Sequence, residues 1–237
     1  MLKIENTEVT GWEAAIRGMR NPMNSWKKSD SIFVEDGECH DICGNSGPYN
    51  GTVTDTETFF EMGEKDFDLM TRLRNSGTDH RKFMRMITVY LDITAPLYWW
   101  KEFDTYKVGT VANSCSTMHK IAAKEFTMDD FSHEHLEGRA LNTLEDMVDE
   151  LNYWRDYYLV TKKQNVIGAC TKAKDIWWQM IQLLPSSYNQ RRTVMLNYEV
   201  LANIYKSRRN HKLDEWHTFC DWIESLPYSE LITGIKN

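Results

Sequence analysis

The stretch from residue 94 to residue 120, TAPLYWWKEFDTYKVGTVANSCSTMHK, constrains the fold more than any other part of this chain. Its Ala95-Pro96 dipeptide marks the place where a strand should end and a helix should begin, because proline is favoured at the first position of a helix. The aromatic residues that follow cover more than one face, which predicts a helix enclosed on most sides. Small polar residues then close the stretch. Together these features predict a pocket floor with a polar rim.

Length and charge limit the classes of protein to which the chain can belong. Its 237 residues are enough to bury a sizeable core. We found no internal repeat, no low-complexity run and no clean linker, so we expect one domain over residues 1–237. The net charge of -7 argues against a nucleic-acid partner, because nucleic-acid-binding proteins display a basic face. We therefore expect small-molecule ligands.

The cysteines and the apolar runs indicate where the protein works. Five cysteines, an odd number, stand at irregular positions, which is typical of free thiols in a reducing compartment. The first residues lack the basic-then-apolar pattern of a signal peptide, and no apolar run reaches membrane-spanning length. We expect a cytoplasmic protein with no membrane partner.

Hydrophobic periodicity and turn residues predict a mixture of strands and helices. The expected strands cover residues 2–9, 31–35, 83–94 and 190–196, and the expected helices cover residues 12–19, 64–74, 134–159, 165–184, 198–206 and 213–226, besides the helix that Ala95-Pro96 opens. Residues 160–164 form a short connection, so the two long helices on either side should pack as an antiparallel hairpin. Residues 21–58 are rich in turn signals and are typical of an irregular loop.

Two groups of residues suggest reactive chemistry, and both have plainer interpretations. Cys39, His40, Asp41 and Cys43 have the residue types of metal ligands. A structural zinc site needs four ligands, usually in two paired clusters, and no second cluster is near, so we expect no metal. Cys115 or Ser116 is a candidate nucleophile with His119 close in sequence, which would make the protein a hydrolase. For Cys115 we favour a buried packing role.

Cationic side chains beside amide side chains favour a nucleotide site. His80, Arg81 and Lys82 precede a predicted strand, where they either hold phosphate or mark a solvated start of that strand. The helix over residues 198–206 carries amides and has arginine pairs on both sides; these residues are Asn197, Asn203, Arg191, Arg192, Arg208 and Arg209. Arginine matches phosphate geometry, and an amide presents a donor and an acceptor to a base edge. Ordinary surface arginines remain the other interpretation.

Two segments resemble the flavin-dependent thymidylate synthases, the thymidylate synthase complementing protein family. In the first, Ala95-Pro96 leads to Thr105-Tyr106-Lys107, where the family has Arg-His-Arg, and then to Asn113-Ser114-Cys115-Ser116, which matches its Asn-x-x-Ser. The second segment contains Leu184-Pro185, Arg191 or Arg192, Asn197, Asn203 and Arg208 in the order of the family's Leu-Pro, Arg, Asn, Asn-Phe, Arg signature. Met118 replaces the family's loop arginine.

The resemblance implies a fold, a reaction and a set of site residues. The implied fold is α+β, a small antiparallel sheet packed with several long helices that include a helical hairpin. The implied protein is a homotetramer that binds FAD and reductively methylates dUMP to dTMP, using methylenetetrahydrofolate and NADPH. The catalytic residues would be Ser116 and Arg208, dUMP would contact Arg191, Arg208 and Ser116, and the FAD set would be His80, Arg81, Lys107, Asn113, Asn197 and Asn203. The alternative is a non-catalytic or repurposed nucleotide- or flavin-binding protein that keeps the fold.

Overall fold

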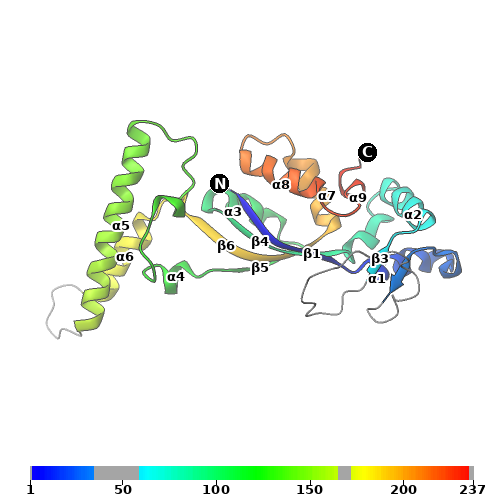
Figure 1. The fold of residues 1–237 in the computed structure, drawn as a ribbon, viewed down its shortest axis with the longest axis horizontal. Coiled ribbons are helices and arrows are strands. Elements are labelled where there is room, and N and C mark those ends of the chain that lie inside the picture. Colours follow the sequence, from blue (N-terminus) through cyan, green and yellow to red (C-terminus); the bar gives the residue numbers. More distant parts are fainter. Residues whose placement is uncertain (1, 35–58, 165–171, 235–237) are drawn as a thin grey trace, which may run out of the picture.

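A four-stranded antiparallel sheet lies at the centre of the computed structural model, which describes residues 2–34, 59–164 and 172–234 (Figure 1). Its strand order is β1-β4-β6-β5. The strands are β1 (Lys3–Thr10), β4 (Thr88–Pro96), β6 (Asn189–Asn197) and β5 (Val111–Ser114). In β4, buried residues alternate with partly or fully exposed ones, so one face of the sheet packs into the core. The opposite face exposes Tyr90, Arg191 and Thr193.

Helices cover the buried face of the sheet (Figure 1). They are α3 (Leu97–Phe103), α7 (Tyr198–Arg208), α8 (Asp214–Glu224) and α9 (Glu230–Thr233). The aromatic run of α3 is enclosed as predicted, with Trp99, Trp100 and Phe103 all buried. Trp99 and Phe103 contact the rings of Trp216 and Phe219 on α8. This aromatic cluster packs α3 against α8 on the buried side of the sheet.

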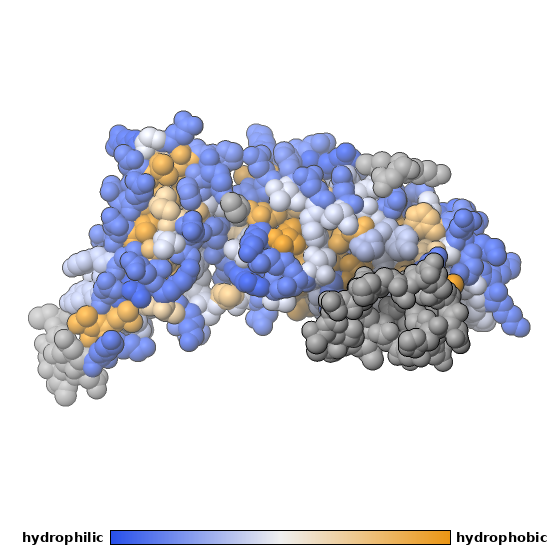
Figure 2. All heavy atoms as spheres, viewed as in Figure 1, coloured by the Kyte–Doolittle hydropathy of each residue, from blue (hydrophilic) through white to orange (hydrophobic). Residues whose placement is uncertain are grey.

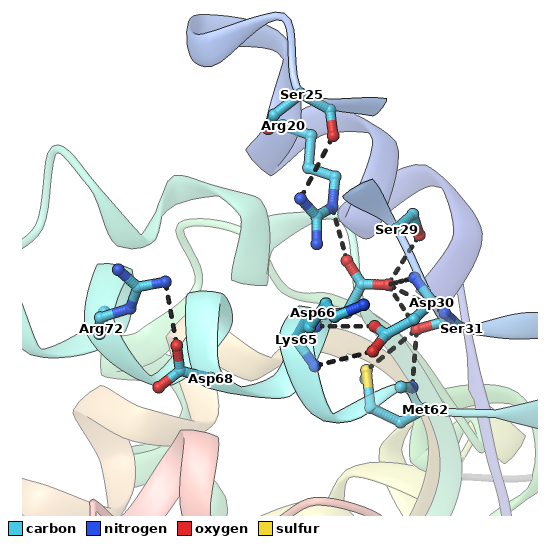
Figure 3. A network of polar contacts seen from close by, with 11 residues as sticks. Arg20, Ser25, Ser29, Asp30, Ser31, Met62, Lys65, Asp66, Asp68 and Arg72 are labelled. Atoms are coloured by element: carbon cyan, nitrogen blue, oxygen red, sulfur yellow. Dashed lines mark hydrogen bonds and ion pairs between the residues drawn. The ribbon is translucent and has the colours of Figure 1, made fainter. Parts of the chain in front are cut away.

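A polar network ties the chain's first helix to the start of α2 (Figure 3). The helices are α1 (Trp12–Arg20) and α2 (Glu64–Asn75), and beside them lie the short strands β2 (Ile32–Val34) and β3 (Phe59–Glu61). Asp66 is fully buried and accepts hydrogen bonds from Arg20 at 2.6 Å, Ser29 at 2.7 Å and Ser31 at 2.8 Å. Asp30 accepts from the backbone N–H groups of Lys65 and Asp66, so it supplies acceptors to the N-terminus of α2.

The helical hairpin extends away from one end of the sheet (Figure 1). It consists of α5 (Arg139–Gln164) and α6 (Ala173–Leu183), which pack along each other. Its core is a separate hydrophobic cluster that includes Phe126, Leu151 and Met180. Apolar side chains run along the visible side of the hairpin (Figure 2). The remaining short elements are η1 (Asn21–Met23), η2 (Trp26–Lys28), η4 (Arg81–Arg85), η5 (Asp104–Tyr106), α4 (Thr117–Lys120) and η6 (Met128–Asp130).

The α+β class, the antiparallel sheet and the hairpin are as predicted, while several boundaries were wrong. The helix expected from residue 134 begins at Arg139. The strand expected from residue 83 starts at Thr88, because the chain first makes the 3-10 helix η4. Pro96 is the last residue of β4 and the N-cap of α3, one position before the one expected. Residues 160–164 continue α5 instead of forming the connection, since they contain no helix-breaking residue.

Two further predictions concern residues that the structure does not describe. The cluster Cys39, His40, Asp41 and Cys43 lies outside the described residues, as do residues 165–171 of the second predicted hairpin helix. Among the helices of residues 2–34, 59–164 and 172–234, none has the length and apolar character needed to cross a membrane.

Candidate ligand-binding site around helix α7

Helix α7 carries three of the predicted site residues, Asn197, Asn203 and Arg208. Asn197 starts the helix: its side-chain oxygen accepts a hydrogen bond from the backbone N–H of Val200 at 3.1 Å, as an N-cap should. The side-chain oxygen of Asn197 therefore already caps the helix. Asn203 is exposed, and Arg208 stands in the last turn. The helix thus carries an amide at its middle and a guanidinium in its last turn, five residues apart.

On one side of α7, the 3-10 helix η4 adds arginines that meet a buried carboxylate. Arg81 donates to the Asn203 side-chain oxygen at 3.0 Å and lies 3.4 Å from Glu199. Arg85 also donates to Glu199, which is 7% exposed, and this hydrogen bond raises the pKa of Arg85. His80, directly before η4, is exposed. Arg81 and Asn203, both predicted to contact FAD, therefore lie together. Glu199 is the ion-pair partner of both Arg81 and Arg85.

On the other side, Arg208 is held by residues of α3, η5 and α8. Its Nη1 donates to the Glu102 carboxylate at 2.7 Å and its Nε donates to the Tyr106 hydroxyl at 2.9 Å. The guanidinium also lies over the ring of Trp216, 4.9 Å from the centroid. The same Glu102 oxygen accepts from the Trp216 indole at 3.1 Å and lies 3.2 Å from His211 Nε2. These contacts fix the side chain of Arg208 in one orientation.

The loop between η5 and β5 lies against the start of α7. Lys107 is exposed there, and none of the salt bridges of the described residues includes it. Gly109 has a φ of +83°, and a Cβ at this position would lie 3.1 Å from Val200 Cγ2 and 3.3 Å from Asn197 Nδ2. Glycine thus permits both the left-handed backbone and the close approach of the loop to the helix.

The exposed sheet face carries Arg191 and Asn113. Arg191 donates to Asp92 at 2.7 Å, and Asp92 also accepts from Thr193 and from Asn6 at 2.8 Å. The hydrogen bonds from Thr193, Arg191 and Asn6 lower the pKa of the Asp92 carboxyl to about 2. Asn113 of β5 pairs opposite Thr193 and is exposed on the same face. The face therefore has a ladder of polar side chains in which the carboxylates of Asp92 and Glu5 both lie near Arg191.

The candidate nucleophiles have no activating base among the described contacts. Ser116 is the N-cap of α4, and its hydroxyl oxygen accepts from the backbone N–H of His119 at 3.1 Å. The His119 ring makes no recorded hydrogen bond to either candidate within the described chain. Cys115 is exposed, so the prediction of a buried packing role was wrong. It follows directly after the edge strand β5, where few neighbours are available to cover it.

Sequence reasoning missed the carboxylates that accompany the predicted arginines. Glu199 faces Arg81, Asp92 faces Arg191, and Glu102 faces Arg208. In the sequence these partners stand 99 to 118 positions apart, so no local pattern reveals them. A phosphate would meet each of these arginines already paired.

The comparisons with known proteins identify the fold. No protein-family model matches the sequence, and no curated protein matches it either. The chain is similar in structure to thymidylate synthase X from Helicobacter pylori, solved with FAD and dUMP, with a TM-score of 0.64, 14% identity, and coverage of 99% of this chain and 98% of that one. A second structure, the flavin-dependent thymidylate synthase of Helicobacter pylori complexed with FAD and dUMP, gives a TM-score of 0.63, 15% identity, and coverage of 99% and 100%.

Proposed function

We propose that this chain, with the fold of the flavin-dependent thymidylate synthases, is an FAD-dependent enzyme that reductively methylates dUMP to dTMP. The observation that carries the proposal is the fold similarity over 99% of the chain to structures solved with FAD and dUMP. The placement of Asn197, Asn203 and Arg208 along α7 adds support, because it joins residues from the second of the two resembling segments on one helix.

The proposal gives each predicted residue a role consistent with its surroundings. Bound flavin would supply the hydride, and the protein would supply orientation and electrostatics. Asn203 and Arg81, joined by a hydrogen bond, would contact FAD together with His80, Lys107, Asn113 and Asn197. Ser116, Arg191 and Arg208 would contact dUMP, with Ser116 and Arg208 nearest the reacting ring.

Further parts of the proposal concern the co-substrates and the assembly. Methylenetetrahydrofolate would supply the carbon, and NADPH would reduce the flavin. We propose a cytoplasmic, single-domain chain that assembles as a homotetramer. The exposed sheet face and the apolar side chains on the hairpin, with Tyr153 at 60% exposure, are surfaces that such an assembly would cover.

A second candidate is a nucleotide- or flavin-binding protein that keeps the fold without the reaction. The pairing of Arg81, Arg191 and Arg208 with carboxylates favours this candidate, because a paired arginine attracts an anionic substrate less than a free one. Loss of the family's Arg-His-Arg at Thr105-Tyr106-Lys107 points the same way.

An activity measurement separates the two candidates. The purified chain is incubated with FAD, dUMP, methylenetetrahydrofolate and NADPH, and dTMP is measured by chromatography. The enzyme proposal expects dTMP formation that requires all four compounds and is lost in Arg208→Ala. Uptake of FAD without dTMP would support the binding protein and overturn the enzyme.

A further inference from the structure

Tyr106 makes contacts that the sequence prediction did not assign to it. Its hydroxyl accepts a hydrogen bond from Arg208 Nε at 2.9 Å, and the Arg208 guanidinium lies 5.6 Å from the centroid of its ring. The ring also meets the fully buried indole of Trp216 edge to face, with the centroids 6.1 Å apart. The backbone carbonyl of Tyr106 accepts from the Thr110 hydroxyl at 2.8 Å. Tyr106 is therefore held by Trp216 and Thr110 while it binds Arg208.

Two residues of one short segment bind the same guanidinium. Glu102 of α3 lies four positions before Tyr106 of η5, and it accepts from Arg208 Nη1 at 2.7 Å. Glu102 is fixed in turn, because the same carboxylate oxygen accepts from the Trp216 indole at 3.1 Å. The guanidinium itself lies over the ring of Trp216. A planar guanidinium that is bonded at both Nε and Nη1 cannot turn without breaking one of these hydrogen bonds.

These contacts leave one nitrogen of Arg208 for a ligand. No hydrogen bond recorded within residues 2–34, 59–164 and 172–234 uses Arg208 Nη2. The side chain of Arg208 is only 17% exposed, so the surface that it offers is small. A side chain that is ordered before binding loses less conformational freedom when the ligand arrives, which increases affinity. The direction in which Nη2 points therefore depends on the partners of Nε and Nη1.

We infer that Tyr106 is a positioning residue, whose hydroxyl orients Arg208 so that Nη2 is presented to dUMP. The inference rests on the proposed function, since it takes Arg208 to contact dUMP. It deepens that function by giving a role in dUMP binding to a residue that acts through Arg208. Tyr106 is better suited to a test than Glu102, because removal of its hydroxyl changes no charge near the anionic substrate.

The test removes the hydroxyl and keeps the ring. Dissociation constants for dUMP are measured by calorimetry with excess FAD, using the full chain and its Tyr106→Phe variant. We expect Tyr106→Phe to weaken dUMP binding roughly 3- to 10-fold, the value of one hydrogen bond. Arg208→Ala and the double variant with both substitutions complete a cycle. The dissociation constants of these two variants should differ by less than about 2-fold, because Tyr106 acts through Arg208.

Two readouts distinguish positioning from a general structural effect. Loss of folded protein lowers the number of dUMP sites per chain that calorimetry reports and leaves the dissociation constant of the remaining sites unchanged. Tyr106→Phe should instead raise the dissociation constant and leave the number of sites unchanged. In the dTMP assay it should also raise the KM for dUMP, whereas loss of folded protein lowers only the apparent kcat.

Tyr205→Phe is the matched control. Tyr205 lies on α7 three positions before Arg208, and its hydroxyl donates to Glu224 instead of binding the guanidinium. The substitution therefore removes the same group from the same region without removing a contact of Arg208. We expect Tyr205→Phe to leave the dissociation constant for dUMP unchanged.

The outcomes separate this inference from the proposed function. The inference alone is overturned if Tyr106→Phe binds dUMP as tightly as the unchanged protein, if Tyr205→Phe loses as much affinity, or if the loss persists in the Arg208→Ala background. If the cycle shows the expected coupling but no dTMP is formed, the inference stands and the proposed reaction fails. If the unchanged protein binds no dUMP, both fail.

Discussion

At the scale of single residues, several of this protein's arginines are held in place by ion pairs with carboxylates. The most deeply buried case is Asp66, which accepts from Arg20 where both side chains are at most 4% exposed. Removing one partner of such a pair leaves an uncompensated buried charge, which is far more costly than losing an exposed pair. The Arg20–Asp66 pair should therefore be a principal tie between α1 and α2.

Replacing Asp66 by asparagine tests this tie. We expect Asp66→Asn to lower the free energy of unfolding by roughly 3–5 kcal/mol, the typical cost of breaking a buried pair. Asp68→Asn is the matched control, because Asp68 pairs with Arg72 on the same helix with both side chains about two-thirds exposed. Its effect should stay below about 1 kcal/mol. Urea denaturation measures both, and equal effects would refute the role assigned to Asp66.

The lowered pKa of Asp66 predicts that the stability of the protein depends on pH. Burial alone would raise the pKa of Asp66, but hydrogen bonds from Ser29, Ser31 and Arg20 outweigh it and lower the pKa below its usual value. A lowered folded-state pKa stabilises the protein above the unfolded-state value of about 4 and loses that contribution as the pH falls further. The free energy of unfolding of the unchanged protein should exceed that of Asp66→Asn by the full amount at roughly pH 6–7, two units or more above that value. This difference should shrink below about pH 4. A difference that stays constant across this range would contradict the assignment.

At the scale of elements, close backbone contacts fix where helices begin. Gly11, the N-cap of α1, has a φ of +89°, and a Cβ there would lie 2.1 Å from the Met86 carbonyl oxygen. Gly77 also has a positive φ, of +107°, but nothing lies within 4 Å of its would-be Cβ. The two glycines therefore share the backbone requirement and differ in the contact.

Replacing each glycine by alanine separates the cost of the left-handed backbone from the cost of the close contact with Met86. Gly77→Ala should cost about 1–2 kcal/mol, the penalty of a left-handed non-glycine residue. Gly11→Ala should cost at least roughly 2 kcal/mol more, since the backbone of Met86 must also move. Thermal and urea unfolding provide the comparison. Equal losses would show that the contact with Met86 has no energetic weight.

The helical hairpin should respond to mutation separately from the sheet, because its core is a distinct hydrophobic cluster. Leu151 is fully buried there, so Leu151→Ala should destabilise the hairpin by about 2–5 kcal/mol through lost contacts and a cavity. Glu145→Ala on the exposed face of α5 is the control, with an expected effect within about 0.5 kcal/mol. Hydrogen exchange should speed up in α5 and α6 and not in β4 and β6. Equal acceleration in the sheet would contradict this independence.

Elements could be predicted from the sequence where one local pattern dominates. The alternation in β6, the Asn197 cap of α7 and the aromatic run of α3 each specify an element through neighbours in the chain. The candidate site could be predicted only in part. Arg81 and Asn203 were both expected to bind FAD, but their pairing, and the carboxylates opposite the arginines, depend on contacts across more than 90 residues.

At the scale of the whole molecule, the exposed sheet face should be covered in an assembly. Tyr90 is 43% exposed and Val111 is 60% exposed on that face. We expect light scattering to give four times the chain mass of 27.9 kDa. Tyr90→Glu should shift the population toward smaller species, because it would bury a charge at an interface. A monomer at micromolar concentration would contradict the proposed homotetramer.

The uptake of FAD tests the central proposal most directly. The purified chain is saturated with FAD, passed through gel filtration, and its visible flavin absorption is compared with its protein absorption. We expect about one FAD to remain per chain at saturation, as an enzyme with one flavin site per subunit requires. Asn203→Ala should weaken binding roughly 5- to 10-fold, the value of one hydrogen bond, while Asn142→Ala on the exposed surface of α5 should not. Folded protein that emerges colourless at every FAD concentration would contradict the flavin function.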